Sequence, residues 1–265
     1  MSHQSYATAP ALNRVPKVTA DFWLIKLVAV TMGETAADYL AVNMGFGLTV
    51  TSIFMSAILI AALVVQFAQQ RYVPWSYWLS VVLISVVGTL VTDNLVDNFG
   101  VALETTAVVF TVLLALTFAV WYFSERTLSI HSIFTFRREA FYWLAILFTF
   151  ALGTAAGDLV AETFGFGYAT TAVIFGVVIA AITAGYYFLG VNAILAFWLA
   201  YIFTRPLGAS IGDLLSQPME YGGFGLGTTV TSIIFLAMIV ATVIYMTMRY
   251  EPETAEIPVG EAFKS

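Results

Sequence analysis

Residues 141–158, FYWLAILFTFALGTAAGD, join a long apolar run to a terminal aspartate. A helix that crosses a bilayer needs about 20 mainly apolar residues. No charged residue interrupts this run before Asp158, so the pattern predicts a transmembrane helix with a carboxylate near its end. Ionisable groups at membrane depth are costly and usually functional. Asp158 is therefore a candidate functional residue.

The composition supports a membrane protein. Of the 265 residues, 60% are hydrophobic and 10% are charged, whereas soluble domains carry about 25% charged residues. Cysteine is absent, and the two histidines, His3 and His131, lie outside the apolar runs. Disulfides, thiolate metal sites and imidazole-bound haem or copper are thus not expected. We expect no covalent cofactor and no nucleic-acid partner.

The distribution of basic residues predicts an orientation. Arginine and lysine occur before the first apolar run, in the loops after the second and fourth runs and after the last run, while the loops after the first, third, fifth and seventh runs contain none. By the positive-inside rule both termini are then cytoplasmic. Tails at 1–20 and 249–265 would flank a single transmembrane domain at 21–248. The eight predicted spans lie near 22–41, 47–68, 76–95, 102–123, 141–160, 167–189, 192–214 and 227–248.

The odd-numbered spans share one pattern, W-x9-G-x4-D. Spacings of 55, 65 and 55 residues separate its four copies, so chance is not a plausible origin. The pattern predicts an all-α protein of eight helices in four parallel two-helix repeats, at 21–70, 76–125, 141–190 and 192–248, with pseudo-symmetry about the membrane normal. A seven-crossing alternative would break this pattern. The four sets are Trp23/Gly33/Asp38, Trp78/Gly88/Asp93, Trp143/Gly153/Asp158 and Trp198/Gly208/Asp213.

Four tandem repeats, each with two transmembrane segments and a shared tryptophan, resemble a family of bacterial multi-pass membrane proteins described as a repeat of unknown function. The resemblance covers roughly residues 20 to 248. It implies an integral protein of the bacterial cytoplasmic (inner) membrane and supplies no activity.

Two of the repeated residue types are expected to be structural. The tryptophans Trp23, Trp78, Trp143 and Trp198 would anchor the cytoplasmic interface. Lys26, three residues after the first tryptophan, would snorkel to the same interface. The glycines belong to small-xxx-small patterns that let helices approach closely. These packing positions are Gly33, Gly88, Gly153, Gly157, Gly208 and Gly212.

The repeated aspartates are the predicted cation-binding or proton-relay groups. Each has a polar neighbour four residues away, on the same helix face. Two alternatives remain: the aspartates could cap the following segment or lie in wet loops. The pairs are Glu34 with Asp38, Asp93 with Asp97, Asp158 with Glu162, and Asp213 with Gln217, and Glu104 is a further acid.

Threonines near the start of each even span add neutral oxygens. They could serve as ligands or bond to their own helix backbone. They are Thr49, Thr51, Thr105, Thr106, Thr170, Thr171, Thr228 and Thr229.

Arg205 is expected to be an internal counter-charge. It lies within the seventh span, next to the helix-kinking Pro206, and should seek a carboxylate. Glu34, in another repeat, is the predicted partner.

An acid-lined centre without sulfur or imidazole offers hard oxygen ligands for protons, Mg²⁺, Ca²⁺ or Mn²⁺. The leading hypothesis is a membrane transporter or exporter of a hard divalent cation, which is bound reversibly and exchanged for protons. The alternatives are a proton-coupled carrier of a small organic solute and a non-transporting membrane scaffold. An enzyme is not expected, because the chain lacks catalytic motifs. The expected partners are the lipid bilayer and an ion or small-molecule substrate. The sequence leaves open whether the protein forms a homo-oligomer.

Overall fold

The computed structural model describes residues 12–249, and every regular element within them is helical. The expectation of an all-α chain is confirmed for this part of the molecule. The remaining residues of both expected tails, 1–11 and 250–265, lie outside the described part. The long helices are α1 (Ala20–Asp38), α2 (Leu48–Ala68), α3 (Pro74–Asp93), α4 (Leu103–Glu125), α5 (Phe136–Asp158), α6 (Gly167–Leu189), α7 (Ala193–Ser216) and α8 (Gly227–Arg249).

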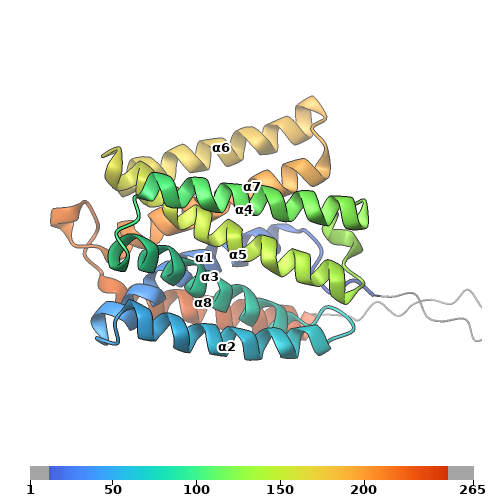
Figure 1. Ribbon diagram of the computed structural model, residues 1–265, viewed down its shortest axis with the longest axis horizontal. Coiled ribbons are helices and arrows are strands. Elements are labelled where there is room, and N and C mark those ends of the chain that lie inside the picture. Colours follow the sequence, from blue (N-terminus) through green and yellow to red (C-terminus); the bar gives the residue numbers. More distant parts are fainter. Residues whose placement is uncertain (1–11, 250–265) are drawn as a thin grey trace, which may run out of the picture.

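The odd-numbered helices form an inner ring and the even-numbered helices surround it. α1 packs against α3, α3 against α5, α5 against α7, and α7 against α1, which closes the ring. More than half of the most apolar stretch of α3, α5 and α7 is buried, compared with 11–28% for α2, α4, α6 and α8. Figure 1 shows α1, α3 and α5 between α2 on one side and α6 on the other.

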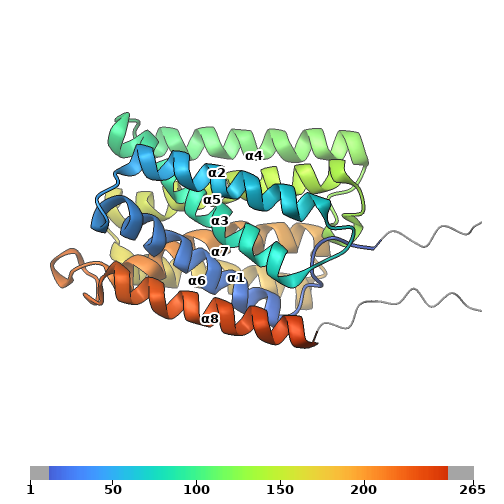
Figure 2. The same ribbon diagram turned by 90° about the horizontal axis from the view of Figure 1, so that it is seen from below.

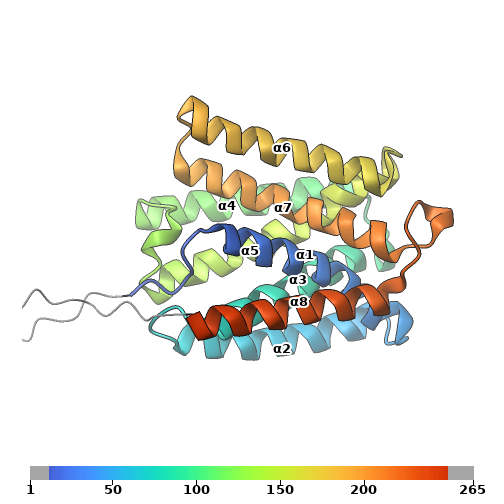
Figure 3. The ribbon, with the colours of Figure 1, turned by 180° about the vertical axis from the view of Figure 1, so that it is seen from behind.

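Each outer helix packs mainly against the inner helix of the next repeat. α2 packs on α3, α4 on α5 and α6 on α7, and α8 completes the cycle by packing on α1. Seen from behind, α1 accordingly lies between α7 and α8 (Figure 3). The two helices of a repeat are therefore consecutive in the chain without forming the main packing pair. Because each outer helix packs on the next repeat, the four repeats are linked into one body.

Seven helices, α2 to α8, are long and apolar enough to cross a membrane. The expected first span, α1, carries Asp21, Lys26, Glu34 and Asp38 within 19 residues and is not among these seven. It nevertheless runs alongside them, and its start lies at the same end of the bundle as the end of α8 (Figure 2). Lys26 and Glu34 are buried among protein neighbours in the inner ring, whereas Asp21 is exposed at the start of the helix.

Glycine allows the inner helices to approach closely. In each inner helix, the glycine of the repeat pattern faces a side chain of the next inner helix, where an added Cβ would overlap. The partner is always the residue seven positions after the tryptophan, so the four contacts obey the same cyclic rule. They are Gly33 with Ser85, Gly88 with Phe150, Gly153 with Arg205, and Gly208 with Val30. Gly157 and Gly212 lie at looser contacts, with Pro206 and Thr31.

The expectation that the tryptophans anchor an interface is wrong for three of the four. Trp78, Trp143 and Trp198 are at most 4% exposed, and Trp23 is half-buried. The indole N–H groups of the buried three donate to the Tyr72 hydroxyl, the Glu139 carboxylate and the Leu128 carbonyl. The reason is that the inner helices turn these side chains toward the bundle, where outer helices and loops cover them.

The glycine contacts predict a position-specific packing defect. A Cβ on Gly88 would lie 2.8 Å from the Phe150 Cβ, whereas nothing lies within 4 Å of a Cβ on Gly176 in α6. We expect Gly88→Ala to lower the unfolding free energy by about 1–3 kcal/mol through overpacking. Gly176→Ala is the matched control and should be neutral or stabilising by about 0.5–1 kcal/mol. Thermal unfolding in detergent measures both, and equal shifts would contradict the cyclic glycine contacts.

Candidate functional site

The four repeated aspartates meet in one cavity at the end of the inner ring. The cavity has a volume of about 190 Å³. Glu34 and Asp38 lie within electrostatic range of the other three aspartates. Eight of the nine expected acid and amide residues line this cavity: Glu34, Asp38, Asp93, Asp97, Asp158, Glu162, Asp213 and Gln217. We call it the acidic cavity.

A repeated backbone feature places these carboxylates. Asp38, Asp93 and Asp158 are each the last residue of an α-helix and are followed by a five-residue π-helical turn. Single π-helical turns are rare and occur frequently at functional sites. In the fourth repeat α7 continues as an α-helix past Asp213 to Ser216. The wider turns leave the carboxylates at the rim of the ring, facing the cavity.

The aspartates are not helix caps. The side chains of Asp38, Asp93 and Asp158 make no capping hydrogen bond to the turns that follow them, and Asp213 lies inside α7. Within residues 12–249 no protein group donates a hydrogen bond to these four carboxylates. Their oxygens are consequently available to water, protons or a cation in the cavity.

Several expected ligands lie elsewhere. Glu104 is exposed in the first turn of α4 and does not line the acidic cavity. The eight threonines also lie outside the cavity lining. One threonine near the start of each even-numbered helix instead donates a hydrogen bond to its own helix, because a threonine hydroxyl reaches the carbonyl four residues earlier. These hydrogen bonds run from Thr51 to Gly47, from Thr106 to Ala102 and from Thr171 to Gly167. Thr231, which was not among the expected ligands, makes the same kind of bond to Gly227.

The other threonines have different surroundings. Thr49 contacts the side chain of Asn94, and Thr228 that of Asn43. Thr105, Thr170 and Thr229 are exposed.

Below the acidic cavity the inner ring is filled by successive layers. Counting back from each aspartate in steps of four residues gives four further positions on each inner helix, all buried. The first layer below the aspartates contains Glu34, Thr89, Thr154 and Ala209, and the second contains Val30, Ser85, Phe150 and Arg205. The third contains Lys26, Val81, Ile146 and Tyr201, and the fourth contains Phe22, Tyr77, Tyr142 and Phe197.

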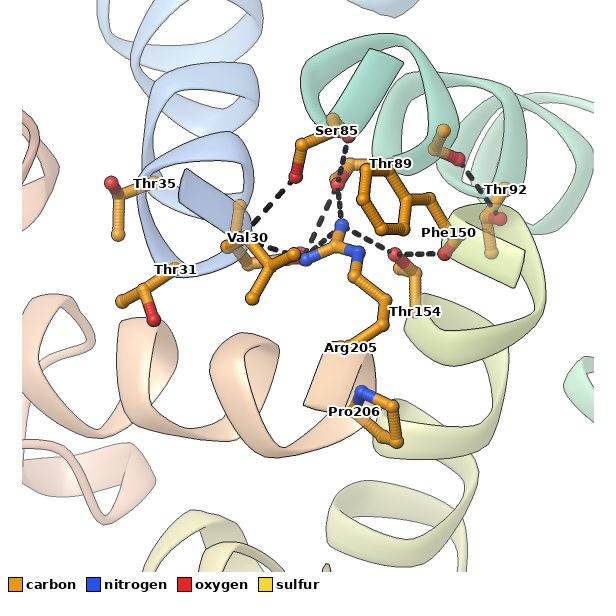
Figure 4. Close-up of polar contacts among 12 residues, drawn as sticks. Val30, Thr31, Thr35, Ser85, Thr89, Thr92, Phe150, Thr154, Arg205 and Pro206 are labelled. Carbon is orange, nitrogen blue, oxygen red and sulfur yellow. Dashed lines mark hydrogen bonds and ion pairs between the residues drawn. The ribbon is translucent and has the colours of Figure 1, made fainter. Parts of the chain in front are cut away.

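A buried ion pair crosses the centre between the first and second layers. The Arg205 guanidinium lies 2.9 Å from the Glu34 carboxylate, the partner expected from the sequence, and the Arg205 side chain is fully buried. Arg205 Nη1 donates to the Val30 carbonyl at 2.9 Å, and Nη2 donates to the hydroxyls of Thr154, at 2.8 Å, and Thr89 (Figure 4). These contacts join all four inner helices.

Lys26 is buried in the third layer, so the expectation that it snorkels to an interface is wrong. Its Nζ donates to the Tyr201 carbonyl at 3.0 Å and lies 3.9 Å from the Tyr201 ring centroid. The Phe150 ring is near both internal cations, with its centroid 5.5 Å from Lys26 Nζ and 5.8 Å from Arg205 Cζ. A side chain on α1 that faces the ring cannot reach the bundle surface, which is why Lys26 stays inside.

The opposite end of the ring is closed by aromatic and polar side chains. In the fourth layer the hydroxyls of Tyr77 and Tyr142 are 2.5 Å apart. Beyond them the fully buried Glu139 forms an ion pair with Arg14 at 2.7 Å and accepts a hydrogen bond from Gln66 at 2.9 Å. Arg14 belongs to the segment before α1, so the chain end covers this side of the bundle. In the described part of the chain, the buried side chains of the four layers lie between this end and the acidic cavity.

Several of these groups were overlooked by sequence reasoning. Thr89, Thr154, Tyr201 and the tyrosine pair occupy layer positions that an alignment of the repeats in four-residue steps would have marked. Glu139 has no counterpart in such an alignment and gave no signal.

The acidic cavity is not a preformed site for a bare metal ion. Among residues 12–249 no group of three or more histidine, aspartate or glutamate side chains is close enough to hold a metal. The volume of about 190 Å³ has room for several waters, each of which takes about 30 Å³ in the liquid. The arrangement is suited to a cation that keeps part of its water shell.

The Glu34–Arg205 pair predicts a large, non-additive effect on stability. Removing one partner leaves a buried charge without compensation, which costs about 3–5 kcal/mol. Glu34→Gln and Arg205→Met should each lower the unfolding free energy by about this amount, and the double variant should lose less than the sum. Thermal unfolding of the four proteins measures the coupling. Additive losses would mean that the pair is not formed in the folded protein.

Comparison with known proteins identifies the repeat. The family model described as "Repeat of Unknown Function (DUF347)" matches four successive segments, 22–72, 76–127, 141–192 and 196–250. These segments coincide with the four repeats of the W-x9-G-x4-D pattern and cover most of the chain. Comparison with curated proteins and with solved structures gave no match. The chain therefore belongs to the DUF347 repeat family.

Proposed function

We propose that this protein is a multi-pass membrane transporter or exporter of a hard divalent cation of the Mn²⁺, Mg²⁺ and Ca²⁺ class, exchanged for protons. The observation that carries the proposal is the acidic cavity, where one carboxylate from each repeat meets above a buried ion pair on the same axis. Four aspartates without protein hydrogen-bond donors are an expensive arrangement near a membrane. Such groups usually mark an ion pathway.

The two rings of helices support a placement across the membrane. The outer helices present apolar side chains to the surroundings along their length, as lipid contact requires. α1 is part of the inner ring, and we infer that it is the eighth crossing, with Lys26 and Glu34 buried in protein instead of facing lipid. The basic loops support a proposed orientation with both termini in the cytoplasm and the acidic cavity on the opposite side of the inner membrane.

The ligand chemistry supports a hard cation. The cavity offers carboxylates and one amide, which suit Mg²⁺, Ca²⁺ and Mn²⁺. Mg²⁺ in particular usually keeps several of its waters, in agreement with the spacing of the carboxylates. Neighbouring carboxylates repel one another, so a cation that enters can replace protons bound among them. This replacement gives a simple basis for exchange.

The closed path requires a conformational change for transport. The Glu34–Arg205 pair and the tyrosine layer separate the acidic cavity from the other end of the bundle. Transport would thus proceed by alternating access, in which the inner helices rearrange around the bound ion. The proline in α7 next to Arg205 is a position where such a helix can bend.

The proposal is tested by flux into proteoliposomes. Purified protein is reconstituted with an Mn²⁺-sensitive dye and a pH dye inside the vesicles, and an Mn²⁺ gradient is applied. We expect Mn²⁺ flux with opposite proton movement in the wild type. Changing Asp38, Asp93, Asp158 and Asp213 to Asn should reduce the flux by about 10²-fold or more, since each carboxylate lost removes charge from the site.

Glu104→Gln is the matched control, because this acid is exposed and outside the cavity. Its flux should equal that of the wild type. Flux that survives loss of all four aspartates would overturn the proposal. No Mn²⁺, Mg²⁺ or Ca²⁺ flux, combined with proton flux driven by an organic solute, would favour the carrier alternative. Absence of every flux would favour the scaffold.

A further inference from the structure

The Arg205 guanidinium occupies a cluster of oxygen atoms supplied by the other three inner helices (Figure 4). We call this cluster the inner seat. It consists of the Glu34 carboxylate and Val30 carbonyl from α1, the Thr89 hydroxyl from α3 and the Thr154 hydroxyl from α5. All four residues are buried, at 5% exposure or less. Glu34 also lines the acidic cavity, so the seat and the cavity share this carboxylate.

These oxygens are the kind that hard cations bind. A carboxylate, a backbone carbonyl and two hydroxyls together carry one negative charge and several lone pairs. In this conformation the charge is neutralised by a side chain of the protein itself. The other inner helices have Val30, Ser85 and Phe150 at the position of Arg205. The fourth repeat therefore supplies a cation where the other three supply the surroundings.

Three observations indicate that Arg205 is a replaceable occupant. Its Nε atom is buried without a hydrogen-bond partner in the part of the chain that the structure describes, so the seat does not satisfy the whole guanidinium. Pro206, the next residue, lies inside α7, and a proline removes a helix hydrogen bond and eases bending. Asp158 of the acidic cavity is within electrostatic range of Arg205 and offers the displaced side chain another partner.

We propose that the inner seat is a second cation site, and that Arg205 is its tethered occupant, which the ion displaces on its way from the acidic cavity. That the ion is the transported one rests on the proposed function. The seat itself does not. Its existence can be tested by binding alone.

The test compares binding to detergent-purified wild type and Arg205→Ala. Titration calorimetry measures the binding of Mn²⁺, added as MnCl₂. Thermal unfolding with and without millimolar guanidinium chloride measures the Tm. In Arg205→Ala the seat is open and Glu34 is unpaired, so we expect Mn²⁺ to bind about tenfold or more tightly than to the wild type. Guanidinium should raise the Tm of Arg205→Ala and leave that of the wild type unchanged, because only the variant has a free seat.

A matched pair of second substitutions separates the seat from simple electrostatics. Removing a positive charge would strengthen Mn²⁺ binding in the acidic cavity even without a seat. Thr154→Val removes a seat hydroxyl, whereas Thr149→Val removes a buried hydroxyl of the same helix that has no hydrogen-bond partner in the described chain. In the Arg205→Ala background, Thr154→Val should weaken Mn²⁺ binding about tenfold and Thr149→Val should not. If the two substitutions change Mn²⁺ binding equally, the proposal that the inner seat binds cations is overturned.

The folding of Arg205→Ala is itself informative. A variant that is recovered folded only when guanidinium is present supports the seat. One that is not recovered with or without guanidinium counts against it.

A measurement of Mn²⁺ flux in single variants that keep Arg205 gives an independent comparison. Thr154→Val should slow Mn²⁺ flux about tenfold relative to Thr149→Val, and equal flux would contradict passage through the seat. If the wild type shows no flux, the transport proposal fails, and the binding titrations still decide whether the seat exists.

Discussion

The ion pair between Glu34 and Arg205 is the interaction on which the centre of the bundle depends. A lone charge at this depth would be prohibitively costly, because no water replaces its lost hydration. The pair connects the first inner helix with the last, and the bonds to Thr89 and Thr154 bring in the other two. The cyclic closure of the inner ring and the compensation of its buried charge are therefore achieved by the same contact.

The ends of the inner ring keep the repeat pattern and its middle does not. Aspartate occurs in all four repeats at one end, and an aromatic residue precedes all four tryptophans at the other. Between them, Lys26 and Glu34 lie on α1 and Tyr201 and Arg205 on α7, while α3 and α5 contribute uncharged side chains. A central axis has room for one ion pair, not for four, since like charges so close together would repel. Identical repeats could not fill it.

The outer helices make the polar interior possible. Because each outer helix packs on the next repeat's inner helix, the apolar shell is continuous around the ring. Charged groups of α1 then face protein neighbours, where hydrogen bonds and aromatic faces compensate them. The same arrangement explains the buried tryptophans, which outer helices and loops cover at the end opposite the aspartates.

The sequence by itself determined the helical class, the four repeats, the aspartate set and the pairing of Arg205 with Glu34. Each of these follows from hydrophobic run length, from exact residue spacing, or from the need of a buried charge for a partner. Only the tertiary structure decided that Trp78, Trp143, Trp198 and Lys26 are interior, that Glu104 stands apart, and that outer helices pack on the following repeat. The physical reason is that spacing along one helix specifies which residues share a face, whereas the object that this face meets, lipid or another helix, depends on how all eight helices pack together.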